Sequence, residues 1–143
     1  MFIGEFKHSL DVKNRLSIPY RFRSNLTKGA VVTRGLDNCL FLYKKDEWVK
    51  IATKISELPF SSAKARAFSR LMLAGAVEVK TDNQGRIILP DYLKKFAKIK
   101  KNIIVAGLYS RIEIWDSQVW QEYKQKTEKD AEKIAETMSD MGI

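Results

Sequence analysis

The chain has 143 residues, a length that fits one compact domain or two small intimate ones, and its 45% hydrophobic and 30% charged residues are ordinary for a soluble globular protein. Lys and Arg outnumber Asp and Glu by 26 to 17, and the net charge of +9 suggests a polyanionic partner, most simply nucleic acid; the alternative is that the lysines only keep the protein soluble. There is no apolar run of the ~20 residues that a membrane span needs, no signal-peptide pattern and only one cysteine, so we expect a cytoplasmic protein without membrane contact or internal disulfide.

The first half begins with apolar and polar residues in alternation, which predicts a strand over residues 2–8. Asp46 is expected to cap a helix that carries Trp48, and Cys39 to fill a small apolar space. The other predicted elements are a turn at 9–14, a strand at 16–18, a basic helix at 20–26, strands at 31–33 and 40–43, and a hairpin turn at 35–38.

The second half repeats most of these elements after a break at 58–62, where Ser61 or Ser62 is expected to cap a helix over 63–73. Asp116 or Ser117 is expected to cap one long polar helix that runs to about Met138. The predicted elements between them are a short strand after Arg86, a helix at 91–96, a strand at 103–105, a turn at 107–110 and a strand at 112–115.

A repeated motif organises the chain. Residues 11–19 and 82–90 both read Asp, three residues, Arg, apolar, any residue, apolar, Pro, and each Asp follows a glycine by seven residues. The match continues through the later strands to Trp48 and Trp120, in the same order both times. Each homologous half is so small that it would be only marginally stable alone, so we expect the two halves to share one core.

This repeat defines four predicted segments. They are a first repeat at 1–57, a helical connector at 58–74, a second repeat at 75–123 and a C-terminal helical tail at 124–143. The tail differs from the body in charge, because residues 117–143 carry four basic and six acidic side chains.

Each motif sets Asp and Arg four residues apart across a turn. In a purely structural interpretation, the carboxylate accepts N–H groups of the turn and the Arg pairs with an acid or points to solvent. Binding is favoured because the motif occurs twice and its turns contain Arg, Lys, Asn and Gln, which read base edges and phosphates. The predicted DNA-contacting residues are Lys13, Asn14, Arg15, Asn83, Gln84 and Arg86, and the residues predicted to shape the turns are Asp11, Asp82 and Gly85.

Residues that could support catalysis are scarce. His8 is the single histidine, there is no His/Cys cluster for a metal, and no Gly-rich phosphate loop is present. The chain is therefore not expected to be an enzyme, and we expect no cofactor, metal or small-molecule substrate. Trp48, Trp115 and Trp120 are predicted to be core or interface anchors.

The two Asp-x-x-x-Arg motifs, the opening Phe2-Ile3-Gly4 with His8 and Leu10-Asp11, and the closing Glu113-Ile114-Trp115 resemble the MraZ family. These are bacterial transcriptional regulators related to the AbrB/SpoVT swapped-hairpin DNA-binding proteins, and the resemblance covers residues 1 to about 125. It implies an α+β fold with a mainly β core, in which two halves of one chain form a double-split β-barrel.

The resemblance also implies a function. It implies a ring-shaped homo-oligomer at the nucleoid that binds short direct repeats in double-stranded DNA, upstream of the bacterial division and cell-wall gene cluster. One departure is visible, because Asn14 stands where the first motif of the family usually has Gly. Asn tolerates the left-handed backbone that such a turn needs, and it adds a donor and an acceptor at the tip.

Two alternatives to this function remain open from the sequence. The basic face could bind DNA or RNA without sequence preference, or the chain could be a scaffold protein whose charge has no ligand. Competition between promoter and scrambled DNA distinguishes the first alternative from sequence-specific binding. The absence of a gel shift with any nucleic acid would indicate the second.

Overall fold

The computed structural model describes residues 1–143 and shows a mixed α/β protein whose strands all pair antiparallel. A six-stranded sheet has the order β1-β7-β8-β4-β3-β5, and β2 and β6 form a separate two-stranded ribbon. The strands are β1 (Phe2–Ser9), β2 (Arg15–Ser17), β3 (Ala30–Arg34), β4 (Leu40–Lys44), β5 (Val77–Val79), β6 (Arg86–Ile88), β7 (Asn102–Tyr109) and β8 (Arg111–Asp116). The helices are α1 (Tyr20–Arg23), α2 (Lys45–Ser56), α3 (Ala63–Ser69), α4 (Asp91–Phe96), α5 (Ser117–Lys129) and α6 (Ala131–Ser139).

The strand order has an approximate twofold symmetry that relates the two halves. β1 and β5 lie at the two edges of the sheet, β7 and β3 lie next to them, and the equivalent strands β8 and β4 pair at the centre. In the ribbon, Leu16 pairs with its own counterpart Ile87. Each edge strand pairs with a strand of the opposite half, because β1 pairs with β7 and β5 with β3.

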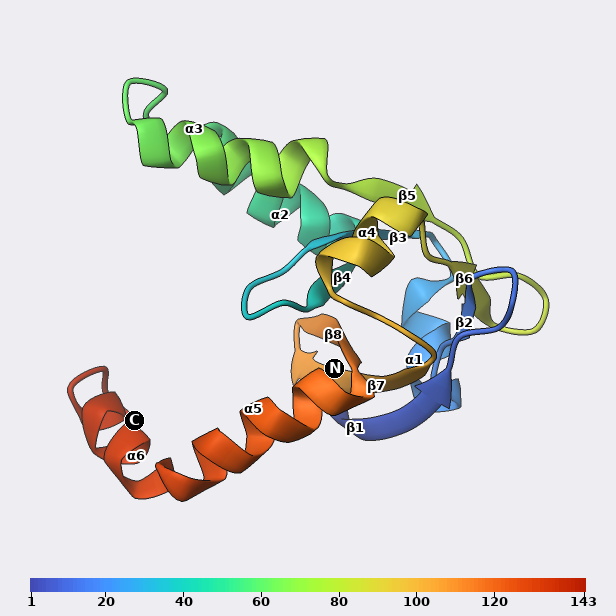
Figure 1. The fold of residues 1–143 in the computed structure, drawn as a ribbon. Helices are drawn as coiled ribbons and strands as arrows, with labels where there is room; N and C mark the ends of the chain where they lie inside the picture. Colours follow the sequence, from blue (N-terminus) through green and yellow to red (C-terminus); the bar gives the residue numbers. More distant parts are fainter.

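The sheet separates two apolar clusters because successive side chains of a strand point to opposite faces. On β4, Leu40 and Leu42 join a core of 20 buried residues from both halves, which confirms the predicted shared core. Phe41 and Tyr43 face the other cluster, against which side chains of α2, α3 and α5 pack. Figure 1 shows the arrangement that results: α2 with α3, and α5 with α6, extend from one end of the molecule, away from the ribbon.

Several predicted features differ from the structure. Residues 107–109 continue β7 instead of forming a turn, because β1 pairs with β7 as far as Tyr109. Asp46 lies inside α2 and makes no cap, since the chain passes from β4 into this helix without a loop; its carboxylate still lies in the first turn, near the positive end of the helix dipole.

The observed helix ends also differ from the predicted ones. The long C-terminal helix breaks at Asp130 into α5 and α6, and Asp is a residue that favours helix ends over helix interiors. The predicted helix 20–26 is α1 followed by a 3₁₀ turn at Ser24–Leu26, and the helix 63–73 is α3 followed by a π-helical turn at Arg70–Ala74. Ser62 and Asp116 do cap their helices, as predicted.

Candidate nucleic-acid interface

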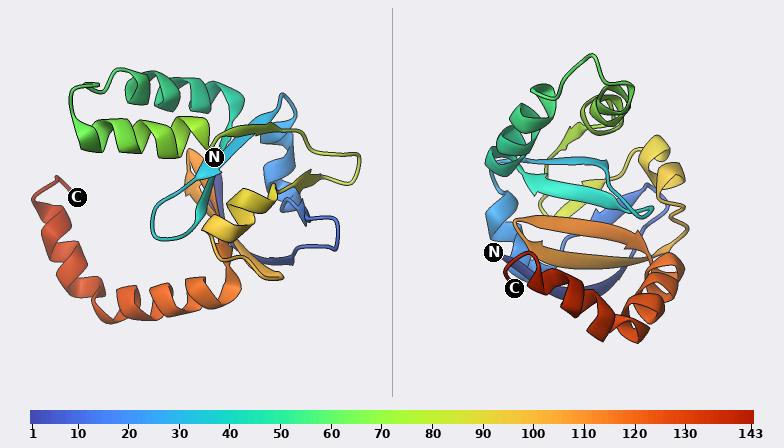
Figure 2. Two further views of the ribbon diagram at one scale, coloured as in Figure 1. Left: turned by 45° about the horizontal axis from the view of Figure 1, so that its top comes forward. Right: turned by 90° about the vertical axis from the view of Figure 1, so that its left-hand side faces the viewer.

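The ribbon places the two Asp–Arg motifs side by side at one end of the molecule. We call residues 11–15 turn 1 and residues 82–86 turn 2. Arg15 pairs with Ile88 and Ser17 with Arg86 across β2 and β6, so each turn lies beside the end of the other motif. Figure 1 and the left view of Figure 2 show the two loops projecting together, opposite the helical arms.

Turn 1 is built around the carboxylate of Asp11. Its Oδ1 accepts the backbone N–H groups of Lys13 and Arg15, both at 2.9 Å, and its Oδ2 accepts the Nε–H of Arg15 at 2.6 Å. Asn14 has a φ of 60°, the left-handed conformation that the turn requires. The side chain of Arg15 is therefore held through Nε, and its two Nη groups make no hydrogen bond within the protein.

Turn 2 repeats this geometry. Asp82 accepts the backbone N–H groups of Gln84 and Arg86 at 2.9 Å and the Nε–H of Arg86 at 2.8 Å. Gly85 has a φ of 74° at the position that Asn14 occupies in turn 1. The predicted role of Asp as a turn residue and the predicted left-handed position are both present in the two copies.

The same contacts lower the pKa of both aspartates. The backbone N–H of Arg15, followed by its side-chain hydrogen bond, the N–H of Lys13 and the positive charge, lowers the pKa of Asp11 from its ordinary value. The corresponding groups of Arg86 and Gln84 lower the pKa of Asp82. Both carboxylates are therefore ionised at neutral pH and fix their arginines in place.

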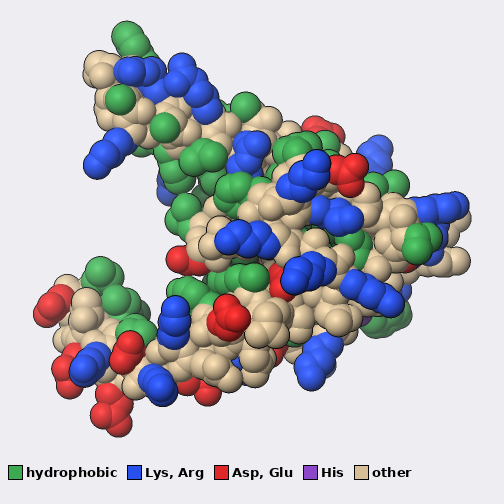
Figure 3. Space-filling model, viewed as in Figure 1, with side chains coloured by type: hydrophobic (Ala, Val, Ile, Leu, Met, Phe, Trp, Pro, Cys, Tyr) green, Lys and Arg blue, Asp and Glu red, His purple; other side chains and the backbone are tan.

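The other predicted contact residues fall into two groups. The side chains of Lys13, Asn83 and Gln84 are exposed at the tips and make no hydrogen bond within the protein. Asn14 instead turns toward α4, where its Nδ2 donates to Asp91 Oδ1 at 3.0 Å and its Oδ1 accepts from Lys94 Nζ at 2.7 Å. Figure 3 shows Lys and Arg side chains gathered over α4 and the turn end of the molecule.

Contacts between the halves were not visible in the sequence. Arg23 of α1 lies against Gly85 of turn 2 and donates its Nε–H to the carbonyl of Ile18 at 2.8 Å. Its counterpart, 71 residues later, is Lys94, which reaches turn 1. The available signal was that both repeats place a basic residue at this helix position, although only the packing of the halves reveals what it contacts.

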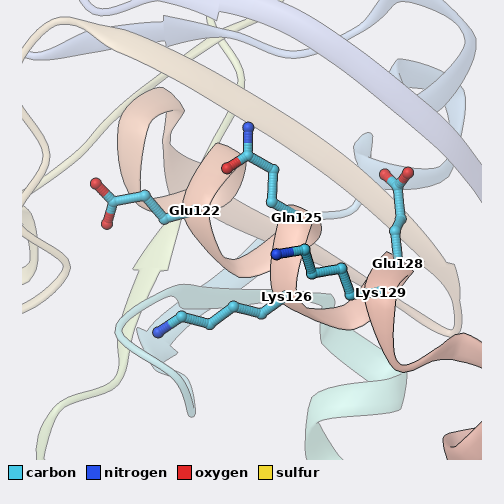
Figure 4. Close-up of a pocket in the computed structure, with 5 residues that line it drawn as sticks. All are labelled: Glu122, Gln125, Lys126, Glu128 and Lys129. Carbon is cyan, nitrogen blue, oxygen red and sulfur yellow. The ribbon is translucent and has the colours of Figure 1, made fainter.

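The surface beside α5 differs from the turn end in its shape and lining. A hollow beside α5 is lined only by charged or polar residues of that one helix, namely Glu122, Gln125, Lys126, Glu128 and Lys129 (Figure 4). It lacks the apolar walls with converging polar groups that characterise ligand pockets. No group of three or more His, Cys, Asp or Glu side chains is arranged to hold a metal ion, and none of the helices has the length and apolarity to cross a bilayer.

Comparison with known proteins identifies the family. The family described as "MraZ protein, putative antitoxin-like" matches the chain twice, at residues 1–71 and 72–141. The chain belongs to the MraZ family. Proteins named "Transcriptional regulator MraZ" from Caldanaerobacter subterraneus subsp. tengcongensis and Halothermothrix orenii are each 46% identical to it over 143 residues, 100% of both chains.

A third MraZ relative, from Desulforamulus reducens, carries the same name and is 45% identical over 141 residues, 99% of each chain. MraZ proteins are transcriptional regulators and not enzymes. The two family matches follow one another along the chain, which confirms the repeat that the motifs indicated.

Proposed function

We propose that this MraZ protein is a sequence-specific DNA-binding regulator, with turns 1 and 2 as the elements that contact double-stranded DNA. The observation that supports this best is the geometry of the two arginines. Each is held by an aspartate through Nε alone, and its Nη groups remain available at the surface. Both come to one end of the molecule because β2 pairs with β6.

This geometry suits base recognition in the major groove. A guanidinium with free donors can contact O6 and N7 of guanine in a bidentate manner, and such a contact contributes about 1–3 kcal/mol of discrimination. Fixing the side chain in advance reduces the conformational entropy lost on binding. Lys13, Asn83 and Gln84, exposed beside the arginines, would add phosphate and base-edge contacts.

Asn14 has a different place in this proposal. Its amide already bonds to Asp91 and Lys94, so in the bound protein we assign it to the support of turn 1 instead of to the bases. Asp11, Asp82 and Gly85 keep the role of shaping the turns.

The proposal includes the finer properties that the family resemblance implies. The six-stranded sheet, the ribbon and the shared core would form the double-split β-barrel, with repeats at 1–57 and 75–123, the connector 58–74 and the tail 124–143. The targets would be short direct repeats upstream of the bacterial division and cell-wall gene cluster, bound in the cytoplasm at the nucleoid.

We also propose assembly into a ring, which would present several modules to spaced repeats and raise affinity by making each added contact intramolecular. Two exposed regions support self-association. Ile134 and Met141 leave apolar surface on and after α6, whose neighbouring residues are mostly acidic, and Leu58 and Phe60 are exposed at the basic tip of the α2–α3 hairpin. Figure 3 shows hydrophobic side chains together with Lys and Arg side chains at that tip.

A gel-shift titration with the DNA upstream of the protein's own gene tests the function. Arg15→Ala and Arg86→Ala should each weaken binding by about 1–3 kcal/mol per engaged module, or roughly 5- to 150-fold. Lys28→Ala, which removes one positive charge from an exposed site between the 3₁₀ turn and β3, is the matched control and should change affinity little.

Three outcomes would contradict the proposal. If Arg15→Ala stays folded and binds normally, the assignment of the turns is wrong. Equal affinity for promoter and scrambled DNA at fixed salt would leave a nucleic-acid binder without sequence preference, and no shift with any nucleic acid would leave a scaffold protein. Light scattering on the same preparation measures the mass and tests the ring.

A further inference from the structure

Each turn is contacted by a basic residue from the short helix of the opposite half. Arg23 of α1 and Lys94 of α4 occupy the same position in the two repeats, and they reach turn 2 and turn 1 respectively. Each turn also accepts a main-chain hydrogen bond from the residue that follows the ribbon strand of the other half, because Ile18 N–H donates to Gly85 O and Leu89 N–H donates to Asn14 O, both at 2.9 Å. The two halves therefore surround each turn with equivalent groups.

At turn 2, Arg23 keeps its charge available. A Cβ on Gly85 would overlap the Arg23 guanidinium, so the glycine provides the space in which the arginine lies. One donor, Nε, bonds to the carbonyl of Ile18, and the Nη groups make no hydrogen bond within the protein. No carboxylate pairs with Arg23; its neighbour is the ring of Tyr20, 5.6 Å from the guanidinium carbon.

At turn 1, the equivalent charge takes part in a network of side-chain hydrogen bonds at the surface. Turn 1 carries the Asn14 side chain at the position where turn 2 has Gly85. The Oδ1 of Asn14 accepts a hydrogen bond from Lys94 Nζ at 2.7 Å. The amide nitrogen of Asn14 donates to Asp91, the residue that stands in place of Tyr20. The ammonium is therefore bound within the protein beside an acidic group, whereas the guanidinium of Arg23 is not.

We propose that Arg23 is a further DNA-phosphate-binding residue, and that Asn14 with Asp91 withdraws Lys94 from the same role at turn 1. The two turns then bind the DNA backbone with unequal numbers of contacts, because only turn 2 has the additional phosphate contact. This inference rests on the proposed binding of DNA by the turns. It assigns the module a stronger and a weaker side in spite of its approximate twofold symmetry.

The salt dependence of DNA binding measures the number of phosphates that the protein contacts, because each neutralised phosphate contributes about 0.9 to the slope of log affinity against log salt. Arg23→Gln removes the charge and keeps a side-chain N–H that can bond to Ile18. It should reduce the slope by about 0.9, so that the wild type loses about 3.5-fold more affinity than this variant between 50 and 200 mM salt. Lys94→Gln should leave the slope unchanged.

A second comparison tests the role of Asn14. The double variant Asn14→Gly, Asp91→Tyr places the residues of turn 2 around Lys94. In this background Lys94→Gln should lower the slope by about 0.9, although the same change has no effect in the wild type. Thermal unfolding of each variant confirms that the compared proteins are folded.

The outcomes separate the two proposals. If the wild type fails to bind DNA at any salt concentration, the proposed function fails and this inference with it. If the wild type binds and Arg23→Gln and Lys94→Gln have equal effects on the slope, only the inference is overturned. A Lys94→Gln effect that is the same in both backgrounds would overturn the role of Asn14.

Discussion

Turn 1 and turn 2 have the same internal hydrogen bonds but different surroundings. In both, an aspartate binds two backbone N–H groups and the Nε of an arginine, and a residue in the left-handed region precedes that arginine. Around turn 1, however, Asn14 bonds to two side chains of α4, and around turn 2 a bare glycine lies under Arg23. The motif thus determines the shape of each turn, and the opposite half determines what that turn presents.

The largest effect should come from the apolar pair of the ribbon that directly follows the two turns. Leu16 and Ile87 pair across the ribbon and are almost completely buried in the common core. Leu16→Ala and Ile87→Ala should each lower the free energy of unfolding by about 2–5 kcal/mol, through lost apolar burial and the cavity left behind. Chemical denaturation measures both, and values that differ by more than about 2 kcal/mol would show that the halves contribute unequally to the core.

A smaller effect should distinguish the turns from each other. Gly85→Ala should destabilise the protein by about 1–3 kcal/mol, because a side chain is strained at a φ of 74° and its Cβ would displace Arg23. Asn14→Gly should remain within about 1 kcal/mol of the wild type, since relief of the left-handed backbone offsets the loss of one exposed and one part-buried hydrogen bond. Thermal melts compare the two variants, and equal losses would mean that the surroundings of the turns do not differ in energy.

The smallest effect concerns pH, where the turns should behave alike. The folded-state pKa values of Asp11 and Asp82 are lowered, so the stability these groups contribute is present above their ordinary pKa of about 3.8 and is lost as pH falls through the folded-state values. Asp11→Asn and Asp82→Asn should each flatten the loss of stability below about pH 4 to a similar extent. Urea unfolding at several pH values tests this, and a wild-type profile unchanged by either variant would argue against the assigned contacts.

The sequence predicted the features that lie within one repeat. The strand, the Asp turn with its left-handed position, the short helix after the proline and the later strands follow from local patterns. Features that depend on contacts between the halves were predicted incompletely. The strand β7 continues beyond Gly107 because β1 lies beside it, which no pattern around Gly107 indicates.

The candidate site shows the same division. Asp11, Asp82 and the arginines could be recognised from spacing alone, and their hydrogen bonds confirm the predicted turns. Arg23 and Lys94 could not be placed, because they reach residues that are 62 and 80 positions away in the sequence. The bonds of the Asn14 amide to Asp91 and Lys94 of α4 could not be predicted either, and its contact with DNA stays a prediction.

The exchange of edge strands also affects how the chain folds during synthesis. In the sheet β1 pairs with β7, and one side of β3 pairs with β5. A nascent chain that ends before residue 102 therefore has no partner strand for β1. Pairings across about 100 residues are slow to form, and strands that wait unpaired offer edges to other chains. The ribosome must therefore release most of the second half before the first can complete its sheet, and this interval is when the protein is most prone to aggregation.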